Sequence, residues 1–187
     1  TYQDGAGAGS SCVPEKGSTA NSFFRAANYP VGVVDPSNPD RVVVTFGSYI
    51  NRHSNEDNGC EPAGFSEDTG NPLYTGVKTV GACNNDIVLS VSDDGGASFT
   101  GTDTDVRELP SATSAPRQRT TDQWFHWAAY TRDGKLATSY YDRQYGDDEL
   151  TGWSDFSLSG SKGLAHFGVR RVTTSSMPPP TQFAGGF

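Results

Sequence analysis

The stretch SDDGGASF at residues 92–99 decides the fold of this chain. It fits the pattern S-x-D-x-G-x-x-F and directly follows the apolar run Asp86–Val91. This context is typical of a β-hairpin, because short polar side chains accept the turn amides, glycines adopt positive φ and the aromatic residue returns to the core. The positions that carry the pattern, and to which a structural role is assigned, are Ser92, Asp94, Gly96 and Phe99.

The composition favours an all-β protein. Of the 187 residues, 34% are hydrophobic, and 22 are Gly, 8 are Tyr and 10 are Phe. Glycine-rich turns between strands that carry aromatic residues are typical of β-structure, and no long stretch has apolar residues at helical spacing. The length is sufficient for one domain or two.

The charge excludes several classes of partner. The formal net charge is −8 and the calculated isoelectric point is 4.7, and no basic stripe is present. Nucleic acid and anionic membranes are therefore not expected to bind. No apolar run approaches the roughly 18 residues that a membrane-spanning helix needs.

The three cysteines, Cys12, Cys60 and Cys83, allow one disulfide. Cys60 and Cys83 flank a loop rich in Gly, Asn and Asp, and a bridge between them would stabilise the fold by roughly 3 kcal/mol in the chain-entropy model. The alternative is three unrelated thiols, and Cys12 can also pair with a cysteine outside this chain. A disulfide fits the composition, which is typical of a secreted protein.

The chain divides into an extended arm, residues 1–22, and a regular part, residues 23–187. Strands are predicted at residues 29–34, 41–49, 84–91, 97–101, 124–130, 135–141 and 164–174, with polar segments at 50–81 and 142–160.

The strands repeat along the chain. Residues 30–34 align with residues 126–130 at an offset of 96, and residues 41–43 align with residues 135–137 at an offset of 94. Repeats of short antiparallel strands indicate a β-propeller or a β-solenoid, and two meanders in a sandwich are the alternative.

The propeller is favoured because the hairpin motif accompanies the repeat. Blade one would span about residues 23–105 and blade two about 106–187, the second incomplete. Propellers close with about 4–8 four-stranded blades, so these two blades are expected to be a fragment of a larger ring.

Three segments resemble the sialidase-like superfamily, whose repeated hairpin motif is called the Asp-box or BNR repeat. Residues 29–44 resemble the first two strands of a blade, and residues 122–129 and 139–143 resemble parts of the next. The tail through Phe183 resembles secreted bacterial members described as exo-α-sialidase-like. The resemblance implies a propeller of six or seven blades, in which the Asp-box turn lies on the face away from the active site.

The segment Tyr141-Asp142-Arg143 is the best candidate for catalysis. It ends an aromatic strand, where a blade would direct side chains to the mouth of the propeller. An arginine can hold a carboxylate in a bidentate manner, and an aspartate can act as acid or base in glycoside hydrolysis. The alternative is a structural Asp–Arg pair that closes a loop.

Other residues are candidates for substrate binding. Arg25 could contact an anion, aromatic residues could stack on sugar rings, and His126 lies among aromatic residues. The alternatives are a solvated arginine, core aromatics and a buried histidine. The predicted substrate-binding set is Arg25, Trp124, His126 and Tyr145, and Trp127 and Trp153 could stack as well.

No cofactor is predicted, and no spacing of His, Cys or Glu indicates zinc. Acidic residues could supply oxygen ligands to calcium, although such clusters are often only solvated loops. The two clusters are Asp93, Asp94, Asp103 and Asp105, and Asp147, Asp148 and Glu149.

The sequence thus predicts a secreted, sialidase-like glycoside hydrolase that acts on acidic glycans or glycoconjugates. Its other expected partner is the remaining part of the same propeller. The alternative is a non-catalytic propeller that binds glycan or protein, since one fold carries many functions.

Overall fold

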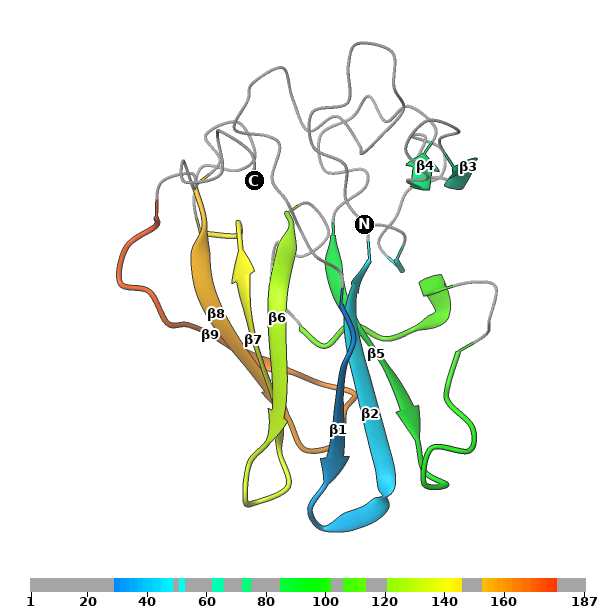
Figure 1. Ribbon diagram of the computed structural model, residues 1–187. Coiled ribbons are helices and arrows are strands. Elements are labelled where there is room, and N and C mark those ends of the chain that lie inside the picture. The colour runs from blue at the N-terminus through cyan, green and yellow to red at the C-terminus, as the bar shows by residue number, and fades with distance from the viewer. Residues whose placement is uncertain are drawn as a thin grey trace.

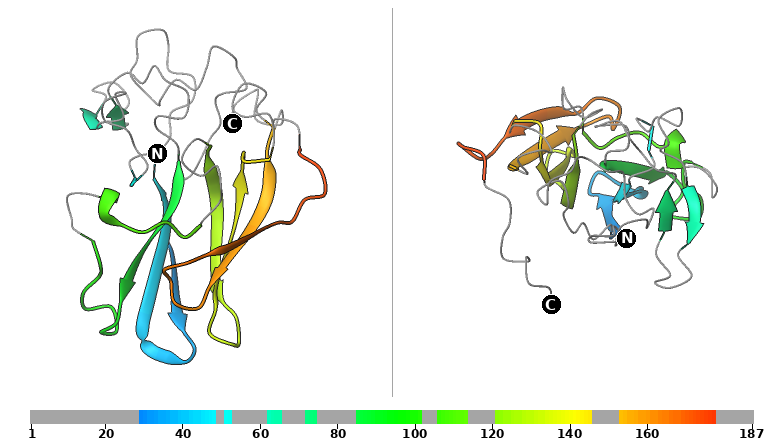
Figure 2. Two further views of the ribbon diagram at one scale, coloured as in Figure 1. Left: turned by 180° about the vertical axis from the view of Figure 1, so that it is seen from behind. Right: turned by 90° about the horizontal axis from the view of Figure 1, so that it is seen from above.

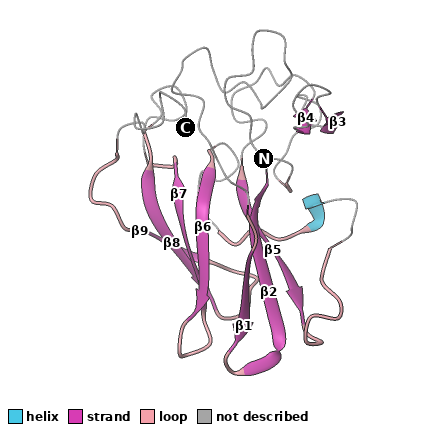
Figure 3. Ribbon diagram, in the orientation of Figure 1, coloured by secondary structure: helices cyan, strands magenta, loops and turns pink. Residues whose placement is uncertain are grey.

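The computed structural model describes residues 29–48, 51–52, 62–65, 72–74, 85–101, 106–113, 121–145 and 153–177. In these residues the fold is all-β, as predicted, with one short 3-10 helix, η3 (Val106–Glu108) (Figures 1 and 3). The predicted arm, Arg25, Cys12 and the predicted bridge between Cys60 and Cys83 lie outside the described residues.

The first sheet has the order β1-β2-β5, formed by β1 (Val31–Asp35), β2 (Asn38–Ser48) and β5 (Asp86–Ser92). Both of its strand pairs are antiparallel. The β-branched residues of β1 and β2 suit a pleated surface that is buried on one side. A separate pair joins β3 (Pro62–Phe65) to β4 (Pro72–Tyr74).

The edge of β5 that does not pair with β2 forms hydrogen bonds with two short segments that follow it in the chain. Just after the turn at residues 92–99, the Thr100 N–H donates to the Val91 carbonyl at 2.8 Å. Further along the chain, Leu89 and Ala112 donate to the carbonyls of Pro110 and Ile87 at 3.0 and 2.8 Å. Residues 97–101, predicted as a strand, form no strand, and residues 110–112, placed in the second blade from the sequence, pair with the first sheet.

The second sheet is a four-stranded antiparallel meander. Its strands are β6 (Gln123–Tyr130), β7 (Leu136–Asp142), β8 (Asp155–Ser161) and β9 (Gly168–Arg171). The sequence analysis assigned residues 142–160 to a polar segment and did not predict β8. The reason is that Asp and Ser occupy the buried positions of this strand. β9 is shorter than the predicted strand at residues 164–174.

The two sheets pack face to face, and β6 lies against β1 and β2 (Figure 2). Hydrogen bonds also cross between the sheets: Tyr29 Oη donates to the His126 carbonyl, and Ser159 Oγ to the Ala112 carbonyl, both at 2.7 Å. The shared core consists of Val31, Val43, Ile87, Leu89 and Ala112 from the first sheet and Ala128, Leu136, Tyr140 and Phe167 from the second.

A β-bulge interrupts β6 between Trp124 and Trp127. Phe125 within it has φ of 46°, which is unusual for a bulky residue. Trp124 pairs with Tyr141 and Trp127 with Ser139, so both tryptophans lie on the same face although they are three residues apart.

The two ends of the sheets differ in character. At the lower end in Figure 1 lie the tight turns at residues 35–38, 92–99 and 131–134, which we call the turn end. At the upper end lie Asp86, Asp122, Asp142 and Asp155, which we call the carboxylate end.

Candidate functional site

Four aspartates are buried at the carboxylate end. Asp86 begins β5, Asp122 precedes β6, Asp142 ends β7 and Asp155 begins β8. Asp142 and Asp155 are direct cross-strand partners. Burying a carboxylate is costly unless it is hydrogen-bonded or paired, so the contacts of each aspartate decide what this end can do.

Asp155 is fully engaged by its neighbours. Arg171 reaches its Oδ1 with Nε at 2.8 Å and with a terminal nitrogen at 2.7 Å. Thr173 Oγ1 donates to Oδ1 at 2.6 Å, and Ser176 Oγ donates to Oδ2 at 2.8 Å. This network ties β8 to β9 and the following segment, and the sequence did not reveal it.

Asp142 is held by the turn that follows it. The Gln144 N–H donates to Asp142 Oδ1 at 2.8 Å, and Gln144 Nε2 donates to Oδ2 at 3.1 Å. Burial raises the pKa of Asp142, the hydrogen bonds from Gln144 oppose that rise, and the charge of Asp155 adds to it. Asp142 is therefore a carboxyl group that retains its proton to a higher pH than an exposed aspartate.

Arg143 pairs with Asp122 in the described structure. A terminal nitrogen of Arg143 lies 3.8 Å from Asp122 Oδ2, and the Arg143 N–H donates to the Asp122 carbonyl at 3.2 Å. The guanidinium carbon lies 5.4 Å from the ring centroid of Trp124, and Arg143 is 1% exposed. This arginine is buried between an acid and an aromatic ring.

Asp122 also joins the two sheets through Asn85. Asp122 Oδ1 accepts from the Asn85 N–H at 2.8 Å. The Gln123 N–H donates to the Asn85 carbonyl at 2.7 Å, and Asn85 Nδ2 donates to the Gln123 carbonyl at 2.5 Å. The residue that contacts Arg143 is thus part of the junction between the first and second sheets.

Tyr141 lies on the other face of β7 from Asp142, because successive side chains of a strand alternate. Its ring stacks on Trp124 at a centroid distance of 5.8 Å. Its ring meets Phe125 and Phe156 edge-on at 6.4 and 5.3 Å. The structure therefore does not bring Tyr141 and Asp142 to the same site.

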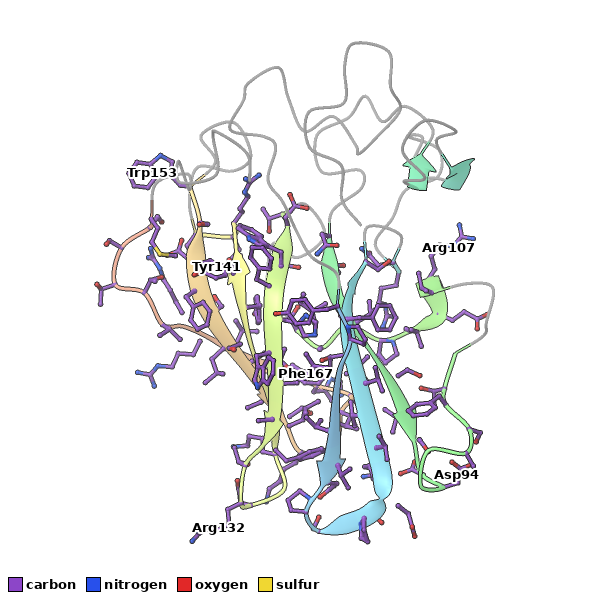
Figure 4. All side chains as sticks on the ribbon, viewed as in Figure 1. Asp94, Arg107, Arg132, Tyr141, Trp153 and Phe167 are labelled. Carbon is purple, nitrogen blue, oxygen red and sulfur yellow. The ribbon has the colours of Figure 1, made fainter. Side chains whose placement is uncertain are left out.

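The predicted substrate-binding residues differ in their accessibility. Trp124 and His126 are buried, and the His126 ring stacks on Tyr29 at 5.4 Å. Burial lowers the pKa of His126, so its imidazole is neutral near neutral pH. Tyr145 is exposed, and the guanidinium of Arg171 lies 5.0 Å from its ring centroid. Trp153 is also exposed at this end (Figure 4).

The turn at residues 92–99 lies at the turn end, where Figure 4 labels Asp94. Ser92 Oγ donates to Asp94 Oδ1 at 2.7 Å, and the Ser98 N–H donates to the same atom at 2.9 Å. Hydrogen bonds from Ser98 and Ser92 hold the pKa of Asp94 well below its usual range. Gly95 and Gly96 have φ of 72° and 94°, as the hairpin pattern predicted.

Phe99 does not pack between the two described sheets. Its side chain is 42% exposed and lines an open hollow of about 320 Å³ beside the turn, together with Val91, Asp93, Asp94, Ser98 and Thr100. The aromatic residue of the motif therefore lies outside the shared core.

The acidic residues considered for calcium are only partly described. Arg41 Nε donates to Asp93 Oδ1 at 2.6 Å, and Asp94 is held by its own turn. Asp103, Asp105 and the cluster at residues 147–149 lie outside the described residues. Across the described ranges, no three His, Cys, Asp or Glu side chains gather as a metal site would require. In the same part of the chain, no helix has the length and apolar character needed to cross a bilayer.

No protein-family model matches this chain, and a search of curated proteins finds no matching relative.

Proposed function

We propose that this chain forms two neighbouring blades of an Asp-box β-propeller, and that the protein is a secreted glycoside hydrolase of the sialidase type acting on acidic glycans. The resemblance of three segments to that superfamily suggests the activity. The composition and the predicted bridge between Cys60 and Cys83 support a location outside the cell.

The sheet topology supports the propeller. Each of the two packed sheets is antiparallel and runs through its strands in chain order from one edge. The Asp-box turn and the buried aspartates lie at opposite ends of the strands. That separation agrees with the expectation that the motif is structural and that chemistry takes place at the other end.

The observation that carries the proposed chemistry is the buried carboxyl group of Asp142. A glycosidase acid must hold a proton until the leaving oxygen needs it, and burial raises the pKa of Asp142 in the required direction. The exposed rings of Tyr145 and Trp153 at the same end offer surfaces on which a sugar ring can stack. We assign proton donation to Asp142 and sugar stacking to these two rings.

The proposal gives no chemical step to Tyr141, because its ring packs on the far face of β7. Arg143 is assigned a positioning role. Its guanidinium group is engaged by Asp122 and the Trp124 ring, and it fixes the chain immediately after Asp142.

The second candidate function is glycan binding without hydrolysis. The burial of Arg143 and its pairing with Asp122 favour it, because a substrate carboxylate would have to displace that contact. The exposed aromatic rings alone would then provide the binding surface.

Hydrolysis of a fluorogenic sialoside by the purified protein, measured over a wide pH range, tests the proposal. Asp142→Asn should lower the rate by about 100-fold or more, the usual loss when a general acid is removed. Asp133→Asn, at the exposed turn between β6 and β7, should leave the rate unchanged.

Two results would decide against hydrolysis by Asp142. If the protein turns over no sialoside at any pH but is retained on immobilised sialylated glycan, the binding function replaces the catalytic one. If Asp142→Asn keeps the full rate, the acid is another residue.

A further inference from the structure

His126 lies at the contact between the two sheets. It belongs to β6, which packs against β1 and β2, and it is 1% exposed. Its ring stacks on Tyr29, which precedes β1, with an interplanar angle of 14°. The Tyr29 hydroxyl also donates to the His126 carbonyl at 2.7 Å. The side chain and the backbone of His126 therefore both contribute to the packing of the sheets.

Only one of the two ring nitrogens of His126 has a partner. A hydrogen bond joins the ring to the backbone of Thr45 in β2. Nε2 is buried and has no hydrogen-bond partner among the described residues, so the bonded nitrogen is Nδ1. The neutral ring presents only a lone pair at Nε2. Protonation would place a second N–H and a positive charge there, where no acceptor waits for them.

The charged groups around β6 do not offset a positive charge on His126. The titratable groups on β6 and on the strands packed against it are Tyr130 on β6, Asp35 on β1, Asp40 and Arg41 on β2, Asp86 on β5, and Tyr140, Tyr141 and Asp142 on β7. Burial is the main cause that lowers the pKa of His126, the Thr45 backbone opposes it, and none of these groups contributes. Within the described residues, a His126 cation would therefore be buried without an anion, which is costly.

We propose that His126 is an acid-sensitive switch in the packing of the two sheets, and that the contact of β6 with β1 and β2 loosens when its ring gains a proton. At higher pH the neutral ring stacks on Tyr29 and the sheets stay closed. At lower pH the charged ring needs water at Nε2, and water reaches that atom only if β6 moves away from the first sheet. The inference uses the packing of the described sheets and does not depend on the proposed hydrolase.

The loosening should extend to the carboxylate end, because the neighbouring hydrogen bonds of β6 cross the same junction. The Gln123 N–H donates to the Asn85 carbonyl at 2.7 Å, and the Asn85 N–H donates to Asp122 Oδ1 at 2.8 Å. Asp122 is the acid that contacts Arg143. Opening at His126 would therefore release the residue that positions Arg143.

The direction of the pH effect follows from the burial of His126. Its pKa lies below the ordinary value of 6.5 in the folded protein, so the unfolded chain binds more protons as the pH falls below that value. The equilibrium constant for unfolding should rise by up to about tenfold for each pH unit, until the lowered pKa is reached. Asp142 acts in the opposite direction, so the effect is measured as the difference between the wild type and a His126 variant at each pH.

Hydrogen–deuterium exchange, corrected for the intrinsic effect of pH on amide exchange, tests the opening in the wild type. The Asn85 and Gln123 amides bond across the junction. Their protection should fall by about tenfold or more between about pH 7 and pH 5. The amides of residues 137–141, in the middle of the second sheet, should change much less.

Two variants remove the titration in different ways. His126→Gln keeps a polar group that can bond to Thr45, and His126→Phe keeps a ring that can stack on Tyr29. Both should lose the additional dependence of unfolding and of exchange on pH. His166→Gln is the matched control, because that histidine is exposed, and it should behave as the wild type.

Two results would overturn the proposal: an equal loss of protection at the junction and within β7, or the same pH dependence in the wild type and in both His126 variants. The exchange experiment on the wild type decides the matter even if the variants do not fold. Sialoside turnover is measured separately, so a protein that opens on acidification and hydrolyses no sialoside would refute the hydrolase and not the switch.

Discussion

The turn end and the carboxylate end satisfy their polar groups in different ways. At the turn end most groups are served by residues a few positions away: Ser37 donates to Asp35, Ser98 to Asp94, and Thr131 to Asp133. The exposed Asp93 is the exception, since it accepts from Arg41 of β2. At the carboxylate end Asp142 is held by the nearby Gln144, but two other aspartates have partners that are distant in sequence. Asn85 binds Asp122 in the other sheet, and Arg171 binds Asp155 across two strands.

This difference has an energetic consequence. A turn satisfied by its own residues can change without disturbing its neighbours, and its groups remain close to water. A buried group whose partner is removed bears the full desolvation cost. Substitutions at the carboxylate end should therefore cost more, and be more strongly coupled, than those at the turn end.

Arg171→Leu should be the most damaging of the single changes considered. It leaves the buried Asp155 without its cation, and the free energy of unfolding should fall by about 3 kcal/mol. Urea denaturation measures this loss. Arg170→Leu is the matched control, since that neighbour is exposed and its loss should stay within about 0.5 kcal/mol. Equal losses for the two arginines would mean that the ion pair does not stabilise the carboxylate end.

Asp142→Asn should change how stability depends on pH. Because the pKa of Asp142 is raised in the folded protein, the folded state binds more protons than the unfolded state above the ordinary aspartate pKa of 3.8. Stability should therefore fall as pH rises through the raised pKa, by about 1.4 kcal/mol for each unit of the rise. Denaturation at a series of pH values should show this slope in the wild type and not in Asp142→Asn. An identical slope in both would contradict the burial of this acid.

Gly96→Ala tests the turn end through the backbone alone. Gly96 has φ of 94°, and a Cβ at this position would meet no atom within 4 Å, so only the left-handed conformation is penalised. The expected loss is about 1 kcal/mol, seen as a lower urea midpoint. Gly32→Ala, where there is also open space and φ is not positive, should cost less. A loss at Gly32 as large as that at Gly96 would contradict the assignment of the cost to the left-handed backbone conformation.

Asp94→Asn should lower stability slightly at neutral pH and should show a pH dependence opposite to that of Asp142. Hydrogen bonds from Ser98 and Ser92 lower the pKa of Asp94 in the folded protein. Its stabilising contribution is present above the ordinary aspartate pKa and is lost as pH falls through the lowered value. Melting temperatures on acidification should fall more in the wild type than in the variant. If acidification lowers the melting temperature of the wild type no more than that of Asp94→Asn, the hydrogen bonds of the turn do not stabilise the Asp94 carboxylate.

The sequence predicted the strands whose buried residues are apolar. Runs of valine and aromatic residues located β1, β2, β5, β6 and β7 to within a few residues. β8 was not predicted, because its buried positions are occupied by Ser157 and Ser159, and a search for alternating hydrophobic residues does not detect buried serines. The pairing of residues 110–112 with β5 was not found either, since it joins segments that are far apart in the sequence.

The candidate site was predicted only in part. The sequence singled out Asp142 and Arg143 because they are adjacent. The contacts of Arg143 with Asp122 and of Asp155 with Arg171 arise when strands align, so neither motif nor spacing indicated them. The separation of Tyr141 from Asp142 was available from the sequence, since neighbouring residues of one strand point to opposite faces.

The bulge at Phe125 inserts one extra residue into β6 relative to its partner strand β7. Deleting Phe125 would leave Trp124 and Trp127 two residues apart, so strict alternation would keep both indoles on the same side of the sheet. The extra residue therefore lengthens β6 by one position relative to β7 without turning either indole to the other face.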